Sequence, residues 1–253
     1  MILTAGKREV RIDPPWLNAA GTLGFSGEAE PLVDTRRLGA FVTHPVTERP
    51  RQPVAGHRLV RYPGGFLLHT GQPNPGLRTV LRRHRHRWGR MEVPVILHLL
   101  VDAPLSARRM LLQIEALDEV AAVEVGVEFN DDGLLDELIH GLLPSELPLL
   151  IRIPLDLGPA VIQRASQAAA VVLTPPRGRT LIEGHLVGGR IFGPAVFPVM
   201  LQAVERYAGT LTCPLIASGG VYDRLQRDAL LAAGAAAVQL DSVLWTHPEE
   251  VLT

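Results

Sequence analysis

The stretch PLIASGGVYDRLQRDALLAAGAAAVQLDSVL (214–244) decides the fold. It starts with an apolar run that ends in Gly219-Gly220, continues with a helix-like segment and closes on a second apolar run. Continuous apolar runs are typical of parallel strands covered on both faces, and a helix between two of them makes a βαβ unit. A Gly-Gly turn at the end of such a strand is also a common phosphate site. The stretch therefore predicts a parallel sheet and raises the question of whether this turn holds a phosphate.

The same alternation of strand and helix continues along the chain. Apolar runs predict strands at 17–24, 40–47, 94–101, 121–129, 148–155, 168–175, 214–221 and 236–244. Helix-like segments lie at 107–120, 133–143, 157–167, 195–209 and 223–234. Eight such units in about 250 residues predict an α/β fold, a (β/α)8 TIM barrel, with residues 1–253 as one domain. The opening ILTAGKREVRI (2–12) predicts a β-hairpin that turns at Ala5-Gly6-Lys7 and plugs the barrel floor.

Composition narrows the function classes. Hydrophobic residues make up 47% of the chain and the net charge is −1, so charge does not indicate a nucleic-acid or membrane partner. The single cysteine, Cys213, excludes a disulfide framework, and no metal site is expected. The basic run RRHRHRWGR (82–90) is interpreted as a solvated helix face. We expect a soluble, cytoplasmic protein that binds a small molecule.

Several segments resemble the dihydroorotate dehydrogenase family, in the same order and at matching spacing. The most specific are PGG…TGQPNPG (63–76), GG…GPA (188–195) and LIASGGV…GAAAVQ (215–239), and the resemblance runs from about residue 9 to 250. It implies a (β/α)8 barrel that binds FMN at its top and oxidises dihydroorotate in pyrimidine metabolism. The positions that match the family's cofactor contacts are Ala20, Gly21, His44, Arg152, Gly189, Gly193, Gly219, Gly220, Asp241 and Ser242.

The base that the family uses is missing. The family places a Cys or Ser in the loop after the fourth strand, and the matching position here is near Phe129 in VEVGVEFNDDG (123–133), which contains neither. Glu128 is the candidate that remains for removing a substrate proton. The alternative is that Glu128 is a carboxylate in solvent.

Two lysines that the family sets against the flavin are replaced by His44 and Arg152. Arg152 stands within an apolar strand run, and an unpaired buried guanidinium is too costly to keep. It either meets an anionic group in the barrel mouth or forms an internal ion pair, for which Glu124 is the candidate. His44 is either a ligand contact or a structural residue.

The family's pyrimidine-reading asparagines are also replaced. The matching positions are Leu68, Gly126 and Thr174. Asn74 and Asn130 remain nearby, so Asn74, Asn130 and Thr174 are the substrate-contact candidates. Each buried polar group of a ligand that is left without its hydrogen bond costs about 1–3 kcal/mol of binding free energy. Dihydroorotate is therefore not the expected substrate.

The family has a Gly-Thr or Gly-Ser pair at the end of the eighth strand, whose backbone amides face the phosphate. Asp241-Ser242 replaces that pair here. A carboxylate about 4 Å from a phosphate charge costs on the order of 4 kcal/mol at an effective dielectric near 20. The loop 175–193 carries arginines that could clamp an anion. Two hypotheses follow. One is an FMN oxidoreductase of this family with altered or lost dihydroorotate oxidation. The other is a non-catalytic barrel with a decayed flavin site that binds a small anion or a partner protein; a homodimer is left open in both.

Overall fold

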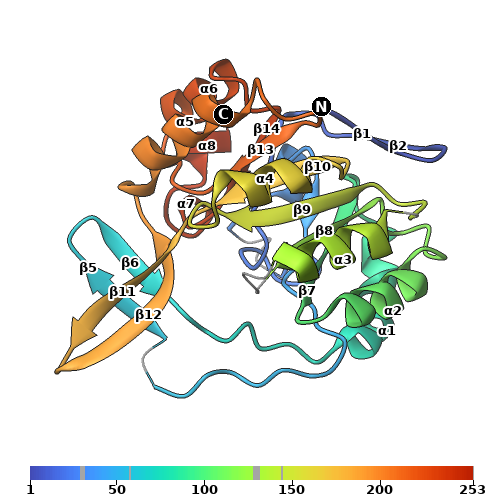
Figure 1. The fold of residues 1–253 in the computed structure, drawn as a ribbon, viewed down its shortest axis with the longest axis horizontal. Helices are drawn as coiled ribbons and strands as arrows, with labels where there is room; N and C mark the ends of the chain where they lie inside the picture. The colour runs from blue at the N-terminus through green and yellow to red at the C-terminus, as the bar shows by residue number, and fades with distance from the viewer. Residues whose placement is uncertain (29–31, 57, 128–131, 144, 253) are drawn as a thin grey trace.

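The computed structural model describes residues 1–28, 32–56, 58–127, 132–143 and 145–252. Eight parallel strands form a nearly closed barrel, with helices around its outside (Figure 1). Their order around the barrel is β3 (Trp16–Asn18), β14 (Ala237–Leu240), β13 (Leu215–Ser218), β10 (Ala170–Thr174), β9 (Leu149–Pro154), β8 (Ala122–Val127), β7 (Val95–Val101) and β4 (Phe41–Val42). Each lies within one of the eight predicted runs or begins one residue before it, so the predicted (β/α)8 barrel is confirmed.

The barrel closes between β3 and β4 through a side chain. Asn18 Nδ2 donates to the carbonyl of Val42 across 2.6 Å, and the Val42 amide donates back to Asn18 Oδ1 across 2.9 Å. The Gly39 amide also donates to the carbonyl of Trp16 across 2.8 Å. The carboxamide thus supplies the donor and acceptor of a neighbouring strand, which satisfies backbone groups that burial would otherwise leave unpaired.

The outer helices are α1 (Leu77–Trp88), α2 (Pro104–Ile114), α3 (Asp132–Leu142), α4 (Pro159–Ala165), α5 (Val196–Tyr207), α6 (Arg224–Ala232), α7 (Val243–Thr246) and α8 (Glu249–Leu252). A 3-10 helix spans Thr35–Arg37. On α1, Val80 and Trp88 are buried while Arg83 and Arg87 are exposed, so its basic run forms a solvated face. Within the described ranges, no helix has the length and apolar character needed to cross a lipid bilayer.

The N-terminal hairpin is also confirmed. Strands β1 (Ile2–Ala5) and β2 (Arg8–Arg11) pair antiparallel around a turn at Gly6-Lys7. Leu3 and Val10 are buried in one apolar cluster with inward residues of the barrel strands, such as Leu150 and Ile216. The hairpin therefore closes the amino-terminal end of the barrel.

A second sheet was not predicted. Strands β5 (Leu59–Tyr62), β6 (Gly65–Leu68), β11 (Arg177–Ile182) and β12 (His185–Phe192) form a four-stranded antiparallel sheet that projects from the barrel (Figure 1). The segment 175–193, interpreted from sequence as a loop, is thus largely a hairpin. Its turn residues Glu183 and Gly184 both have positive φ, 48° and 82°, as two-residue hairpin turns require.

Candidate functional site

A cavity of about 1030 Å³ lies at the carboxyl ends of the barrel strands, beneath the four-stranded sheet. This is the face at which barrels of this kind carry their sites. Its described lining from the barrel includes Ala20, Gly21, His44, His98, Gly126, Arg152, Asp241 and Trp245. Its lining from the second sheet includes Leu68, Arg177, Arg179, Leu186, Gly189, Arg190 and Phe192.

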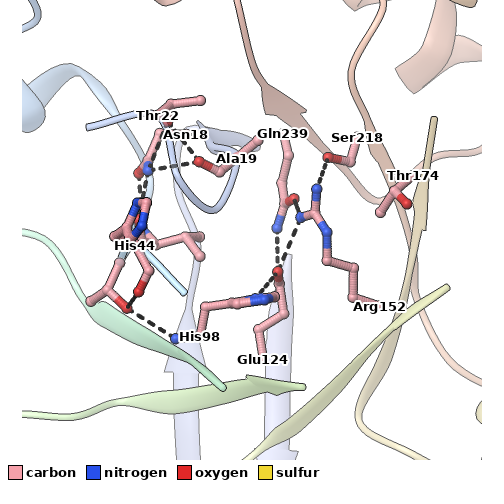
Figure 2. A network of polar contacts seen from close by, with 12 residues as sticks. Asn18, Ala19, Thr22, His44, His98, Glu124, Arg152, Thr174, Ser218 and Gln239 are labelled. Carbon is pink, nitrogen blue, oxygen red and sulfur yellow. Dashed lines mark hydrogen bonds and ion pairs between the residues drawn. The ribbon is translucent and has the colours of Figure 1, made fainter. Parts of the chain in front are cut away.

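A buried polar network forms the floor of this cavity, with Glu124 of β8 at its centre (Figure 2). His98 Nδ1 lies 2.7 Å from Glu124 Oε1, and Arg152 Nη1 donates to the same oxygen across 3.1 Å. Gln239 Nε2 donates to the other carboxylate oxygen. Side chains from β7, β9 and β14 thus meet at the one carboxylate of β8.

Arg152 forms an internal ion pair with Glu124, which was one of the two alternatives that the sequence left open. Besides Glu124, its Nη1 donates to Gln239 Oε1 across 2.7 Å, and its Nη2 donates to Ser218 Oγ across 3.3 Å. The residue is only 8% exposed, yet it also lines the cavity. Glu124 therefore compensates its charge, and Arg152 still borders the space where a ligand fits.

The protonation states of the floor follow from its burial. Burial alone would raise the pKa of Glu124, but the charge of Arg152 and the bond from His98 bring it to about 2. Burial lowers the pKa of His98 in spite of the Glu124 carboxylate. A neutral His98 beside an ionised carboxylate donates through Nδ1–H, so its Nε2 is an acceptor.

His98 Nε2 faces Gly126, which also lines the cavity. A Cβ on Gly126 would lie 2.8 Å from Nε2, so only glycine leaves room for the imidazole there. The sequence signal for His98 and Glu124 was a polar residue within each of two apolar strand runs, 94–101 and 121–129. It becomes a pair only through the strand register, which sets His98 opposite Glu124.

His44 also borders the cavity, beside Gly21. The Phe25 ring meets its imidazole edge-on, with ring centroids 5.1 Å apart. Burial lowers the pKa of His44, so it too is neutral at pH 7 and offers no positive charge in place of a lysine.

The predicted cofactor glycines are distributed differently. Gly189 lines the cavity, but a Cβ there would lie 2.9 Å from the carbonyl oxygen of Leu68. A Cβ on Gly193 would collide with the backbone of Gly64, so both glycines allow β12 to approach β6 closely. The predicted contacts that do not line the cavity are Gly193, Gly219, Gly220 and Ser242.

None of the described substrate candidates lines the cavity. Asn74 Oδ1 accepts from the amide and hydroxyl of Thr47 and from the Gly76 amide, so it holds its own loop together. Thr174 is fully buried and its hydroxyl accepts from Arg190 Nη1 across 2.7 Å. Glu128 and Asn130 lie outside the described residues. The assignment of these residues to catalysis or substrate binding stays a prediction.

Asp241 stands on the cavity wall at the end of β14 and is 3% exposed. Its Oδ1 accepts from the Ser242 amide across 2.6 Å. Burial raises its pKa to about 6, although Ser242, Arg152 and the Gly220 amide favour the charged form. A carboxyl group therefore stands in the turn that the resemblance assigns to phosphate.

Cys213 lies at the opposite end of the barrel, in a second hollow beside the N-terminal hairpin. Burial raises the pKa of its thiol to about 11, so it is unreactive at neutral pH. Within the described part of the chain, no group of three or more His, Cys, Asp or Glu side chains is arranged to hold a metal ion.

Comparisons with known proteins agree with this architecture. The family model for dihydroorotate dehydrogenase matches residues 5–125. A dihydroorotate dehydrogenase B (NAD(+)) catalytic subunit from Desulforudis audaxviator is 28% identical, over 92% of this chain and 84% of the relative. The catalytic subunit of the same name from Pelobacter propionicus is 24% identical, over 97% of this chain and 88% of the relative.

Solved structures show the same fold. A dihydroorotate dehydrogenase from Eimeria tenella, in complex with ferulenol, has a TM-score of 0.73 at 14% identity, over 96% of this chain and 79% of that one. A mutant of FabK from Thermotoga maritima has a TM-score of 0.55 at 14% identity, over 92% of this chain and 62% of that one.

Proposed function

We propose that this chain, a divergent member of the dihydroorotate dehydrogenase family, is a dihydroorotate dehydrogenase-like oxidoreductase. In this proposal the barrel mouth holds a flavin-type ring. Dihydroorotate oxidation is altered or lost. The observation that carries the proposal is the cavity itself. At about 1030 Å³ it lies at the upper end of the range for small-molecule pockets, and six of the ten predicted cofactor contacts line it: Ala20, Gly21, His44, Arg152, Gly189 and Asp241.

The residues of the cavity fit the ring end of such a ligand. The floor offers an acceptor in His98 Nε2, and Arg152 borders the same space. Phe192 and Trp245 supply aromatic wall, with ring centroids 6.5 Å apart. A flat heteroaromatic ring with N–H donors and carbonyl acceptors matches this mixture of aromatic and polar lining. When bound, a flavin would supply the hydride-accepting chemistry of an oxidoreductase.

The phosphate end of FMN does not fit in the same way. Asp241 places a carboxyl group in the turn where a phosphate would lie, and Gly219 and Gly220 do not line the cavity. We therefore propose that the cavity binds the ring end of such a ligand and does not bind an FMN phosphate in the same way.

Loss of dihydroorotate oxidation is supported by the substrate side of the site. The positions that match the pyrimidine-reading asparagines are Leu68 and Gly126 on the cavity, and Thr174 outside it. A site that reads a polar ring cannot replace those hydrogen bonds with leucine and glycine. We expect no orotate formation at ordinary enzyme rates of roughly 1–1000 per second.

The relatives are named as catalytic subunits, so we propose that this chain also works beside a partner protein; a second copy of the chain is the alternative partner. Neither a nucleic acid nor a membrane is part of the proposal.

A second candidate function is a non-catalytic barrel that binds a small anion. It is favoured by the charge of the cavity, because its described lining includes five arginines, Arg51, Arg152, Arg177, Arg179 and Arg190, against the single carboxyl group of Asp241. Anions pair well with several guanidinium groups at once.

The visible absorption spectrum of the purified protein separates the two. The proposal expects a yellow preparation, or a colourless one that takes up added flavin with a shifted and quenched spectrum. A colourless protein that takes up neither FMN nor riboflavin would contradict it and leave the anion-binding barrel.

A further inference from the structure

The turn after β14 is already occupied by a carboxyl group of the chain itself. Asp241 Oδ1 accepts from the Ser242 amide across 2.6 Å and from the Ser242 hydroxyl across 3.2 Å. The amide of Gly220 also favours its charged form. The Tyr222 hydroxyl lies 2.7 Å from Ser242 Oγ and holds that side chain in place. Backbone donors of the kind that would face a bound phosphate therefore face Asp241.

Asp241 also fills the space above the Gly-Gly turn. Gly219 has φ of +89°, and a Cβ on it would lie only 2.6 Å from Asp241 Oδ2. The Pro175 ring closes the same space, because its Cγ would lie 2.8 Å from that Cβ. A phosphate group cannot enter over Gly219 unless the Asp241 carboxyl leaves.

The second oxygen of this carboxyl group is buried without a partner. Among the described residues, none makes a hydrogen bond to Asp241 Oδ2. Buried polar atoms without a partner are rare in proteins, and they point to a missing water or ligand. Because Asp241 lines the cavity, a ligand inside it can supply the missing donor.

We infer that Asp241 replaces the ligand phosphate at this end of the cavity, and that the site selects a ligand that ends there in a hydroxyl or another hydrogen-bond donor. The inference rests on the proposed function for the identity of the ring. For a flavin-type ligand, it means that riboflavin, which ends in a hydroxyl, binds in preference to FMN.

A matched pair of ligands tests this directly. Riboflavin and FMN share the ring and differ only in the terminal phosphate, so each is titrated at pH 8 into the wild type, Asp241→Gly and Asp241→Asn, with flavin fluorescence as the readout. Asp102→Asn is the control, because Asp102 is exposed, follows β7 and does not line the cavity. We expect the wild type and the control to bind riboflavin at least tenfold more tightly than FMN. Asp241→Gly, which empties the turn, should gain at least tenfold for FMN, a change worth about 1.4 kcal/mol. Asp241→Asn removes the charge but keeps the shape of the side chain, so it should gain less than Asp241→Gly.

A wild type that binds FMN as tightly as riboflavin, with no gain in the Asp241 variants, would overturn the inference while leaving the proposed flavin site intact. Failure of every protein to bind either flavin would instead overturn the proposed function.

A second measurement decides the role of Asp241 without any flavin. The melting temperature is measured in inorganic phosphate and in chloride at equal ionic strength. We expect phosphate to raise the melting temperature of Asp241→Gly above that of the same variant in chloride, and to have no such effect on the wild type. An equal rise in both proteins would show that the carboxyl group does not occupy the phosphate turn, and would overturn the inference.

Discussion

His98 Nδ1 and Glu124 Oε1 lie 2.7 Å apart on two adjacent barrel strands, and this pair fixes the chemistry of the cavity floor. The carboxylate holds the imidazole proton on Nδ1, and Arg152 holds the carboxylate ionised. The floor therefore presents an acceptor nitrogen and a compensated guanidinium to the cavity, and each part can be tested separately.

The first prediction concerns the stability that Glu124 provides. Glu124→Gln leaves Arg152 as a buried, uncompensated charge, so we expect the free energy of unfolding to fall by about 3–5 kcal/mol. Glu119→Gln is the matched control, since its partner Arg85 is half-exposed and such pairs contribute about 0–1 kcal/mol. Urea unfolding at pH 7 measures both. Equal, small losses would mean that the buried ion pair does not stabilise the barrel.

The second prediction concerns the tautomer of His98. Because burial lowers its pKa and Glu124 accepts from Nδ1, we expect a neutral ring with its proton on Nδ1 throughout pH 7–9. Nitrogen chemical shifts of histidine-labelled protein report this, and His98→Gln identifies the signal. A signal with both ring nitrogens protonated at pH 7 would contradict the acceptor role of Nε2.

The barrel could be predicted from sequence because its strands are continuous apolar runs, and each run specifies its own burial. The four-stranded sheet could not, because β6 pairs with β12 more than a hundred residues later, as in the contact of Leu68 with Arg190. A short polar hairpin shows which residues turn, but not which distant strand completes it.

The site shows the same limit. His44 and Asp241 follow strand ends and Arg152 lies within β9, and all three line the cavity; their role in binding a cofactor stays a prediction. The sequence pattern does not predict the direction in which a side chain or a glycine faces. A Cβ on Gly193 would collide with the backbone of Gly64, and Asn74 Oδ1 accepts from the Gly76 amide of its own loop. These contacts depend on the second sheet and on local turns, neither of which the apolar pattern encodes.

The third prediction concerns Gly126, which leaves room for His98. Gly126→Ala puts a Cβ 2.8 Å from Nε2, so we expect a loss of about 1–3 kcal/mol of unfolding free energy. In a His98→Ala background the same substitution should cost less, with a coupling energy of about 0.5–3 kcal/mol. Gly141→Ala, in helix α3 and with no atom within 4 Å of its Cβ, should be neutral or stabilising by up to about 1 kcal/mol. Additive effects of Gly126→Ala and His98→Ala would show that the two residues do not meet.

The fourth prediction concerns the pH dependence that Asp241 creates. Its pKa is about 6 in the folded chain against an ordinary value of 3.8, so between these values the folded protein keeps a proton that the unfolded chain has lost. Stability from this group is therefore greatest below pH 4 and falls as the pH rises through 6. The loss amounts to roughly 3 kcal/mol, because each unit of pKa difference is worth about 1.4 kcal/mol. The groups that face the carboxyl, namely Arg152, Ser242 and the Gly220 amide, favour its charged form and are outweighed by burial.

Asp241→Asn removes this titration and keeps the shape of the side chain. We expect the difference in unfolding free energy between the variant and the wild type to grow in favour of the variant as the pH rises from 4 to 6.5. Glu124 titrates lower, between about 2 and its ordinary 4.5, and is present in both proteins, so its contribution cancels in the difference. Urea unfolding at half-unit pH steps gives the two curves. Parallel curves across that range would mean that Asp241 ionises freely, and that the turn after β14 is open to solvent.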